Sequence, residues 1–187
     1  MAGVRKIARR DLYRSLSHSF SSPISLTSFI LVAALGTTTN STTQSNYAAI
    51  KEVTHVPVDP SVIFIGERAF CDCEHLEEVE LYQGLRDVGD RAFRNCRRLV
   101  RIAFPSTVRS IDDSAFRDCA SLAEVGLREG LVGIGWGAFR GYVSLVRVTV
   151  PSTVEFVGHE AFRDCRRLCE AELREGVWRV DKDAFQD

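Results

Sequence analysis

The chain has 187 residues, 45% hydrophobic and 26% charged, a composition that excludes wholesale disorder and fits one globular domain. Its net charge of −1 is divided unevenly, because residues 1–50 carry five Lys/Arg and one acid whereas residues 51–187 carry nineteen Lys/Arg and twenty-four acids. Residues 51–187 are acidic and have no basic patch, which argues against nucleic acid as the main partner. No apolar run is long enough to predict an integral membrane span.

Residues 1–36 have features of a targeting segment. The apolar run ISLTSFILVAALG (24–36) has the length of a secretory signal core and ends in small residues spaced for cleavage. Asn40, in the triplet Asn-Ser-Thr, is a candidate glycosylation site if the chain is exported. Residues 4–16 mix apolar side chains with arginines, so an organellar presequence is an alternative. An uncleaved anchor and a disordered tail are two further alternatives for this segment. We predict a secreted or cell-surface protein, with an organellar or cytoplasmic location as the alternative.

Residues 37–50 include TTTNSTTQSN and have the composition of a flexible linker. The stretch KEVTHVPVDPSV, which begins at Lys51, is expected to form an irregular first rung or N-terminal cap. In that cap Val53, Val56 and Val58 would pair with the first strand of the repeats. The repeats themselves are assigned to residues 51–187.

A repeat of 23 residues organises this last region. Ala-Phe pairs recur at that spacing, and Leu, Val or Ile keep the same register at several other positions. A period of 20–50 residues is typical of a solenoid. We count about five full repeats and a partial sixth, with the pairs at 69–70, 92–93, 115–116, 138–139, 161–162 and 184–185.

Each repeat contains a Leu-x-x-Val-x-Leu motif with the two-residue alternation of a short strand. Stacked repeats would place these strands in a parallel sheet along one face, with Ala-Phe-x-x-Cys as the return limb and a short extended piece, starting at residues such as Val88, before it. A turn with left-handed backbone is predicted where the repeats share Gly or Asp, because both residues tolerate that conformation. That position holds Gly66, Gly89, Asp112, Gly135, Gly158 and Asp181.

Two finer patterns overlie the repeat. The loops alternate between YQGL, REGL or REGV and PSTV, which suggests a larger sequence unit of two repeats, 46 residues long. Charges also alternate in one register, which predicts a ladder of opposite charges across the sheet. Each exposed pair contributes only about 0.2–1 kcal/mol, so the ladder should act mainly by fixing the register of the stack. Its members are Glu78, Arg101, Glu124, Arg147 and Glu170.

Cysteines recur at the third position after Phe. In AFRNCRRL (92–99) the neighbouring arginines would lower the pKa of Cys96, and a lowered pKa would make this cysteine a better nucleophile. A nucleophile needs one positioned base and occurs once, whereas this cysteine recurs in most repeats, which indicates a buried packing residue. Parallel side chains disfavour disulfides between repeats, and Cys71 and Cys169 lie off the ladder and are expected at the surface. The ladder comprises Cys73, Cys96, Cys119 and Cys165, with Tyr142 in the fourth repeat.

Two further motifs are only weak evidence for a dinucleotide site and a metal site. GIGWGA (133–138) superficially matches a dinucleotide fingerprint, but it lacks the long helix and the later acidic residue, and its Gly135 and Ala138 are ordinary repeat positions. Cys71, Cys73 and His75 have no second ligand pair for a metal. We therefore predict no catalytic residue, no metal and no cofactor.

The residues that recur in these repeats resemble those of a known family. IGERAFCDCEHLEEVEL, VGDRAFRNCRRLVRIAFPSTV and VGHEAFRDCRRLCEAEL are similar to BspA-type leucine-rich repeats, over about Val62 to Phe185. The resemblance implies an α/β repeat solenoid, a right-handed coil with short parallel strands on one face and irregular or short helical return limbs. It also implies adhesion or protein binding, and no enzymatic chemistry.

We therefore predict a non-catalytic module that binds a protein or glycan ligand on its sheet. The alternative is a structural protein that self-associates through its C-terminal end, or a fragment of a longer repeat protein. Both are considered because the last repeat, KDAFQD, stops three residues after its Ala, whereas the ends of a solenoid need to be capped. Phe185 would otherwise have to close the core by itself. Strand alternation selects the candidate ligand contacts Glu78, Glu80, Arg101, Arg147, Thr149, Glu170 and Glu172, with Tyr82 at one rim.

Overall fold

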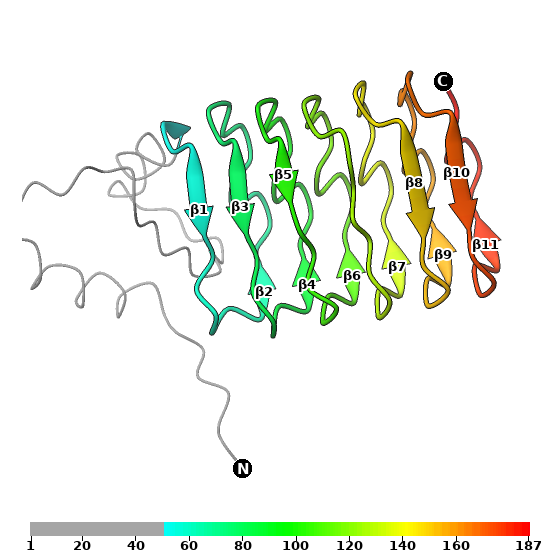
Figure 1. The fold of residues 1–187 in the computed structure, drawn as a ribbon, viewed down its shortest axis with the longest axis horizontal. Helices are drawn as coiled ribbons and strands as arrows, with labels where there is room; N and C mark the ends of the chain where they lie inside the picture. The colour runs from blue at the N-terminus through cyan, green and yellow to red at the C-terminus, as the bar shows by residue number, and fades with distance from the viewer. Residues whose placement is uncertain (1–50) are drawn as a thin grey trace, which may run out of the picture.

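The repeats stack as successive rungs, each consisting of one 23-residue repeat, in a computed structural model that describes residues 51–187 (Figure 1). Every strand pairs in parallel with the equivalent strand of a neighbouring rung. This confirms the parallel solenoid predicted from the 23-residue period. The predicted targeting segment, the linker and Asn40 lie outside the described residues.

The solenoid has two sheet faces. The rear sheet has six strands, one from each rung, and its order is β11-β9-β7-β6-β4-β2. These are β2 (Phe64–Ile65), β4 (Asp87–Val88), β6 (Ser110–Ile111), β7 (Gly133–Ile134), β9 (Phe156–Val157) and β11 (Arg179–Val180). The short extended piece predicted before each Ala-Phe pair is thus a second sheet, which the prediction of strands on one face did not include.

We call the other surface the front face. Its strands are β1 (His55–Pro57), β3 (Glu78–Glu80), β5 (Arg101–Ile102), β8 (Arg147–Val150) and β10 (Glu170–Leu173). They form two separate sheets, β1-β3-β5 and β8-β10. The intervening repeat contributes only the bridge between Ala103 and Gly126. A glycine inside a strand weakens it, because it has high backbone entropy and no side chain to pack.

The return limbs consist of turns, and the predicted short helices are wrong for the described residues 54–187. Each limb except the last contains two residues in the left-handed region, such as Arg91 (φ 52°) and Asn95 (φ 61°). A right-handed helix cannot continue through such residues. The limb amides instead bond within local turns or to the next rung, as when the Phe93 N–H donates to the Ala115 carbonyl at 2.7 Å.

The predicted left-handed turn at the shared Gly or Asp is also wrong. The positive φ occurs two residues later, at Arg68, Arg91, Ser114, Gly137, Glu160 and Asp183. The shared glycine lies instead where neighbouring rungs come closest. A Cβ atom at Gly89 would lie 2.9 Å from the Ile65 carbonyl oxygen, and one at Gly135 would lie 2.6 Å from the Asp112 carbonyl carbon. Glycine therefore permits close stacking at these rungs.

The core is a column of phenylalanine rings. Neighbouring rings from Phe70 to Phe185 stack with centroids 4.9–5.8 Å apart and nearly parallel planes. Phe185 stacks on Phe162 at 5.2 Å and is partly buried. Other apolar side chains of the last rung stay exposed, namely Leu173 (42%), Trp178 (73%) and Val180 (43%).

The alternating loops interlock in pairs. The Thr107 hydroxyl of a PSTV loop donates to the Leu85 carbonyl at 2.7 Å and accepts the Gly84 N–H at 3.1 Å. Thr153 makes the same two bonds to Leu131 and Gly130. This interlocking gives the 46-residue alternation a physical basis.

Candidate binding surface

The sequence-predicted contacts of the front face point outward from its strands. In β3, β5 and β8 the intervening Val79, Ile102 and Val148 are buried, which confirms the predicted alternation in these strands. In β10 all four residues are exposed, so the alternation is absent there. The rim residue Tyr82 is 38% exposed, and its hydroxyl donates to the Glu80 carboxylate at 2.7 Å. The structure thus places on this one face Glu78, Glu80, Arg101, Arg147, Thr149, Glu170 and Glu172.

The predicted charge ladder is formed only in part. The register is as predicted, since Glu78 pairs with Arg101 and Arg147 with Glu170 across the strands. Within the described ladder only Arg147 and Glu170 form an ion pair, at 2.7 Å between exposed side chains. Glu78 lies instead 3.4 Å from the His55 imidazole. The ladder therefore adds little to stability, because exposed pairs contribute at most about 1 kcal/mol.

Sequence alternation missed the apolar side chains at the centre of this face. Val100 and Val146, directly before β5 and β8, are 53% and 41% exposed. The exposed Ala123 lies between them in the same register, with the exposed Glu124 next to it, and the small exposed residues Ala103 and Gly126 lie three residues further along their rungs. The two valines directly precede Arg101 and Arg147 and share one register of the repeat. The front face therefore has a small apolar row, Val100, Ala123 and Val146, which we call its apolar centre and which runs beside the charged ladder.

The cysteine ladder is buried and carries no nucleophile. The thiols of Cys96 and Cys119 donate to the carbonyls of Phe70 and Phe93, each at 3.1 Å. Burial raises the pKa of Cys73 to about 12, so this thiol stays protonated at neutral pH. A thiol cannot react as a nucleophile without losing its proton, which confirms the packing role predicted from the repetition.

The two cysteines outside the ladder differ from each other. Cys169 is exposed, as predicted. Cys71 is half-buried rather than exposed, and its thiol donates to the Asp72 carboxylate at 3.4 Å. Burial, followed by this hydrogen bond, raises the pKa of Cys71 to about 11.

The glycine motif at residues 133–138 is part of the rear sheet. Gly133 and Ile134 form β7, and the residues after them make the turns of a return limb. A dinucleotide site needs a helix N-terminus after such a loop. Within residues 51–187, no three His, Cys, Asp or Glu side chains are grouped as metal ligands. No helix in the same region is long and apolar enough to span a membrane.

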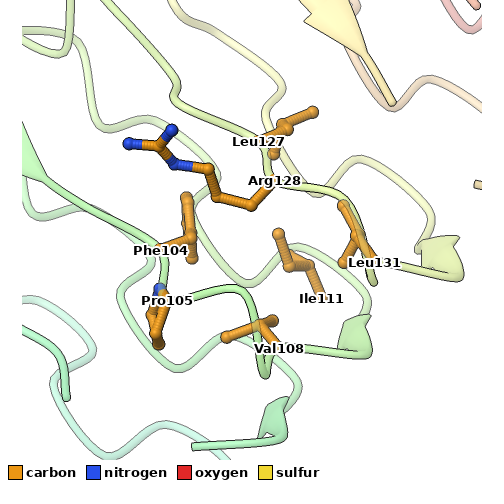
Figure 2. A pocket seen from close by; sticks show the side chains of 7 residues that line it. All are labelled: Phe104, Pro105, Val108, Ile111, Leu127, Arg128 and Leu131. Atoms are coloured by element: carbon orange, nitrogen blue, oxygen red, sulfur yellow. The ribbon is translucent and has the colours of Figure 1, made fainter. Parts of the chain in front are cut away.

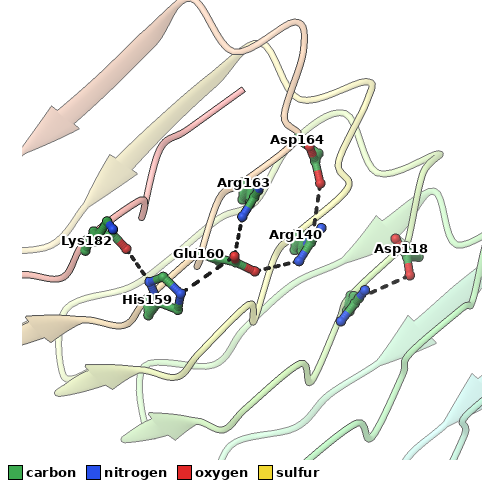
Figure 3. A network of polar contacts seen from close by, with 8 residues as sticks. Asp118, Arg140, His159, Glu160, Arg163, Asp164 and Lys182 are labelled. Atoms are coloured by element: carbon green, nitrogen blue, oxygen red, sulfur yellow. Dashed lines mark hydrogen bonds and ion pairs between the residues drawn. The ribbon is translucent and has the colours of Figure 1, made fainter.

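A polar network clamps the return limbs of the C-terminal rungs (Figure 3). Its centre is the Glu160 carboxylate, only 8% exposed, which accepts hydrogen bonds from Arg163 and, at 2.5 Å, from Arg140. Arg140 also donates to Asp164 at 3.0 Å. Burial alone would raise the pKa of Glu160, but Arg163, Arg140 and His159 outweigh it and lower the pKa. We read this network as structural, because its charges pair with one another.

One apolar hollow lies under the loop at residues 104–108. Figure 2 shows the Arg128 guanidinium at its edge and Ile111 and Leu131 among its walls. The hollow has no room for even a water-sized molecule. It is therefore a packing seam between rungs and no ligand site.

Comparisons with known proteins agree with this architecture. The model for a BspA type leucine rich repeat region, in six copies, matches residues 40–169. A leucine rich repeat protein of T. pallidum is 36% identical over 64% of this chain and 56% of its own, with a TM-score of 0.62. None of the curated proteins matches this sequence.

Two further solved structures are similar. A leucine-rich repeat protein from Bacteroides ovatus is 25% identical over 73% of this chain and 39% of its own, with a TM-score of 0.62. The pneumococcal vaccine antigen PcpA, 18% identical over 71% of this chain and 32% of its own, shares the fold with a TM-score of 0.54. The chain spans about half of the T. pallidum protein and less of the other two.

Proposed function

This chain belongs to the BspA-type leucine-rich repeat family, and we propose that it is a non-catalytic module that binds a protein ligand on its front face. The observation that carries the proposal is the apolar centre of that face. Val100 and Val146 are exposed there, and the exposed Ala123 lies between them in the same register, so short apolar side chains form a row beside the charged ladder.

Charged residues border this centre on both sides. Glu78 and Glu80 lie on β3, and Glu170 and Glu172 on β10, with Arg101 and Arg147 nearer the middle. An apolar centre with a polar rim is the usual anatomy of a protein–protein interface. A glycan is the alternative ligand, but Tyr82 at the rim is the only aromatic side chain among the predicted contacts.

The test is a biosensor titration against a panel of purified extracellular proteins, each intact and enzymatically deglycosylated. We expect Val146→Asp to abolish binding and Val143→Asp to leave it unchanged. The two valines are equally exposed, at 41%, but Val143 lies on a return limb. Binding that survives Val146→Asp would contradict the proposal, and binding that is lost on deglycosylation would favour the glycan.

We also propose that the module acts outside the cell or at its surface. The apolar run at 24–36 and the sequon at Asn40 support this location. The N-terminal sequence and mass of the protein from its native source test it. Cleavage near residue 36 with a glycan on Asn40 is the expected result, and an unmodified N-terminus at Met1 would contradict it.

A second candidate function is self-association through the last rung. Leu173, Trp178 and Val180 are exposed on β10, β11 and the loop between them, and Trp178 is 73% exposed. Sedimentation equilibrium of the chain should then show concentration-dependent oligomers that Trp178→Glu or Phe185→Glu dissociates. A monomer at every concentration would dismiss this candidate.

A further inference from the structure

A groove of about 400 Å³ crosses the outer surface of the rear sheet. That volume is within the range of small-ligand sites, roughly 300–1,000 Å³. The groove exists because adjacent strands carry small residues at outward positions. Gly133 pairs with Ser110 on one side, and Gly135 follows two residues later in the chain.

An aromatic ring forms one wall of the groove. Phe156 of β9 pairs with Gly133 of β7, and its ring extends over this glycine. A Cβ atom at Gly133 would lie 2.4 Å from Cζ of the ring. The Phe156 side chain nevertheless stays 42% exposed, so part of the ring is open to a ligand.

Aspartates line the opposite side. Asp112 accepts the Ser110 hydroxyl at 2.9 Å, and Asp113 accepts the Trp136 N–H at 2.8 Å. Neither forms an ion pair with a described residue, and Asp90 pairs only with the adjacent Arg91. Burial raises the pKa of Asp90 and Asp112, and the negative charges around them raise it further. The groove therefore holds negative charge that the described part of the chain does not neutralise.

The aspartates and the aromatic ring that line the groove favour an organic cation as its ligand. The aspartates are not grouped as ligands for one metal ion. Asp112 follows β6 and Phe156 begins β9, two strands away in the sheet, which separates them by about 10 Å. A long cationic side chain spans such a gap, because its head reaches the carboxylates while its stem lies on the glycines and the ring. Arginine suits this best, since its guanidinium can form two parallel hydrogen bonds to a carboxylate.

We propose that this groove binds an arginine side chain from an extended segment of a partner protein. The net charge of −5 over residues 51–187 complements a basic partner segment. The site is independent of the front face, so one module would hold ligands on two sides.

The test is an NMR titration of the full chain with an eight-residue peptide of alternating glycine and arginine, blocked at both ends. The same peptide with citrulline in place of arginine keeps the shape and removes the charge. We expect the arginine peptide to shift the amide signals of Gly133 and Gly135, and the citrulline peptide to leave them unchanged. Raising the salt concentration should weaken binding, because exposed charges are screened.

Two sets of variants localise the binding. Phe156→Ala should lower the affinity about fourfold, the loss expected when one methylene group of the arginine stem is no longer buried against the ring. Phe64→Ala is the matched control, since Phe64 has the same register on the same sheet, is 41% exposed and lies outside the groove. The double variant Asp112→Asn with Asp113→Asn should also weaken binding of the arginine peptide. If Phe156→Ala does not fold, Phe156→Leu replaces it as the variant that removes the ring.

Three results would overturn the proposal. The first is equal affinity of the wild type and the Phe156 or aspartate variants. The second is an equal shift from the citrulline peptide, or from a neutral oligosaccharide, which would make the groove a polar or glycan site. The third is tighter binding of a peptide of residues 1–16, whose five basic side chains would then make this chain its own ligand.

Discussion

Replacing one ring in the phenylalanine column tests whether stacking between rungs stabilises the solenoid. Phe139 is fully buried and lies between Phe116 and Phe162, with centroid distances of 5.8 and 5.2 Å, while Tyr142 packs edge-on at 5.6 Å. Removing a buried phenylalanine ring costs about 3–5 kcal/mol through lost burial and the cavity it leaves. We therefore expect Phe139→Ala to lower the free energy of unfolding by that amount.

Phe185→Ala is the matched control. Phe185 belongs to the same column but has one stacked neighbour, Phe162, and is only partly buried. Its loss should cost about 1–2 kcal/mol, since half of the stacking and less apolar area are removed.

The assay is urea unfolding of both variants and the wild type, followed by circular dichroism. Because a solenoid is held together by contacts between neighbouring rungs, Phe139→Ala should also broaden the transition or split it into two. Equal losses from the two variants, or a larger loss from Phe185→Ala, would refute the stacked column as the source of stability.

Three other predictions concern single positions. Glu160→Gln should lower the free energy of unfolding by about 2 kcal/mol near neutral pH, because hydrogen bonds from two arginines lose their charged acceptor. Since the pKa of Glu160 is lowered in the folded state, the stability that Glu160 contributes is fully present above its unfolded pKa and is lost as the pH falls through its folded pKa. The free energy of unfolding should therefore fall less steeply with acid in the variant, and an equal fall in the variant and the wild type would contradict this. Gly126→Thr should raise the melting temperature, because a Cβ atom there meets nothing within 4 Å and a β-branched residue favours the missing strand; a lower melting temperature would contradict it. The native protein should react with a thiol reagent at Cys169 first and at the buried ladder only after unfolding, and rapid reaction of Cys96 would contradict its burial.

The 23-residue period was enough to predict the register of the stack. A fixed spacing brings Val79 opposite Ile102 and makes Cys96 a rung of a buried ladder, because equivalent residues of stacked repeats must lie side by side. The outward direction of Glu78 and Arg101 follows from strand alternation for the same reason. Their function as ligand contacts remains a prediction.

The features that depend on local backbone and on distant neighbours were not predictable in this way. Left-handed backbone at Arg91 excludes a helix, yet arginine gives no signal for that conformation. Glycine at Gly89 suggested a turn, whereas the close approach of Ile65 from the previous rung is what requires it. The rear groove combines Asp112 and Phe156, which are far apart in sequence and line one groove only when three strands are in place.

The most direct test of the front-face proposal is hydrogen exchange of the full chain, measured by mass spectrometry with and without the tightest-binding protein of the panel. We predict slower exchange in the segments that contain β5 and β8, where Val100 and Val146 border the apolar centre. Protection confined to the return limbs or to the rear sheet would contradict the proposal that the front face binds the ligand.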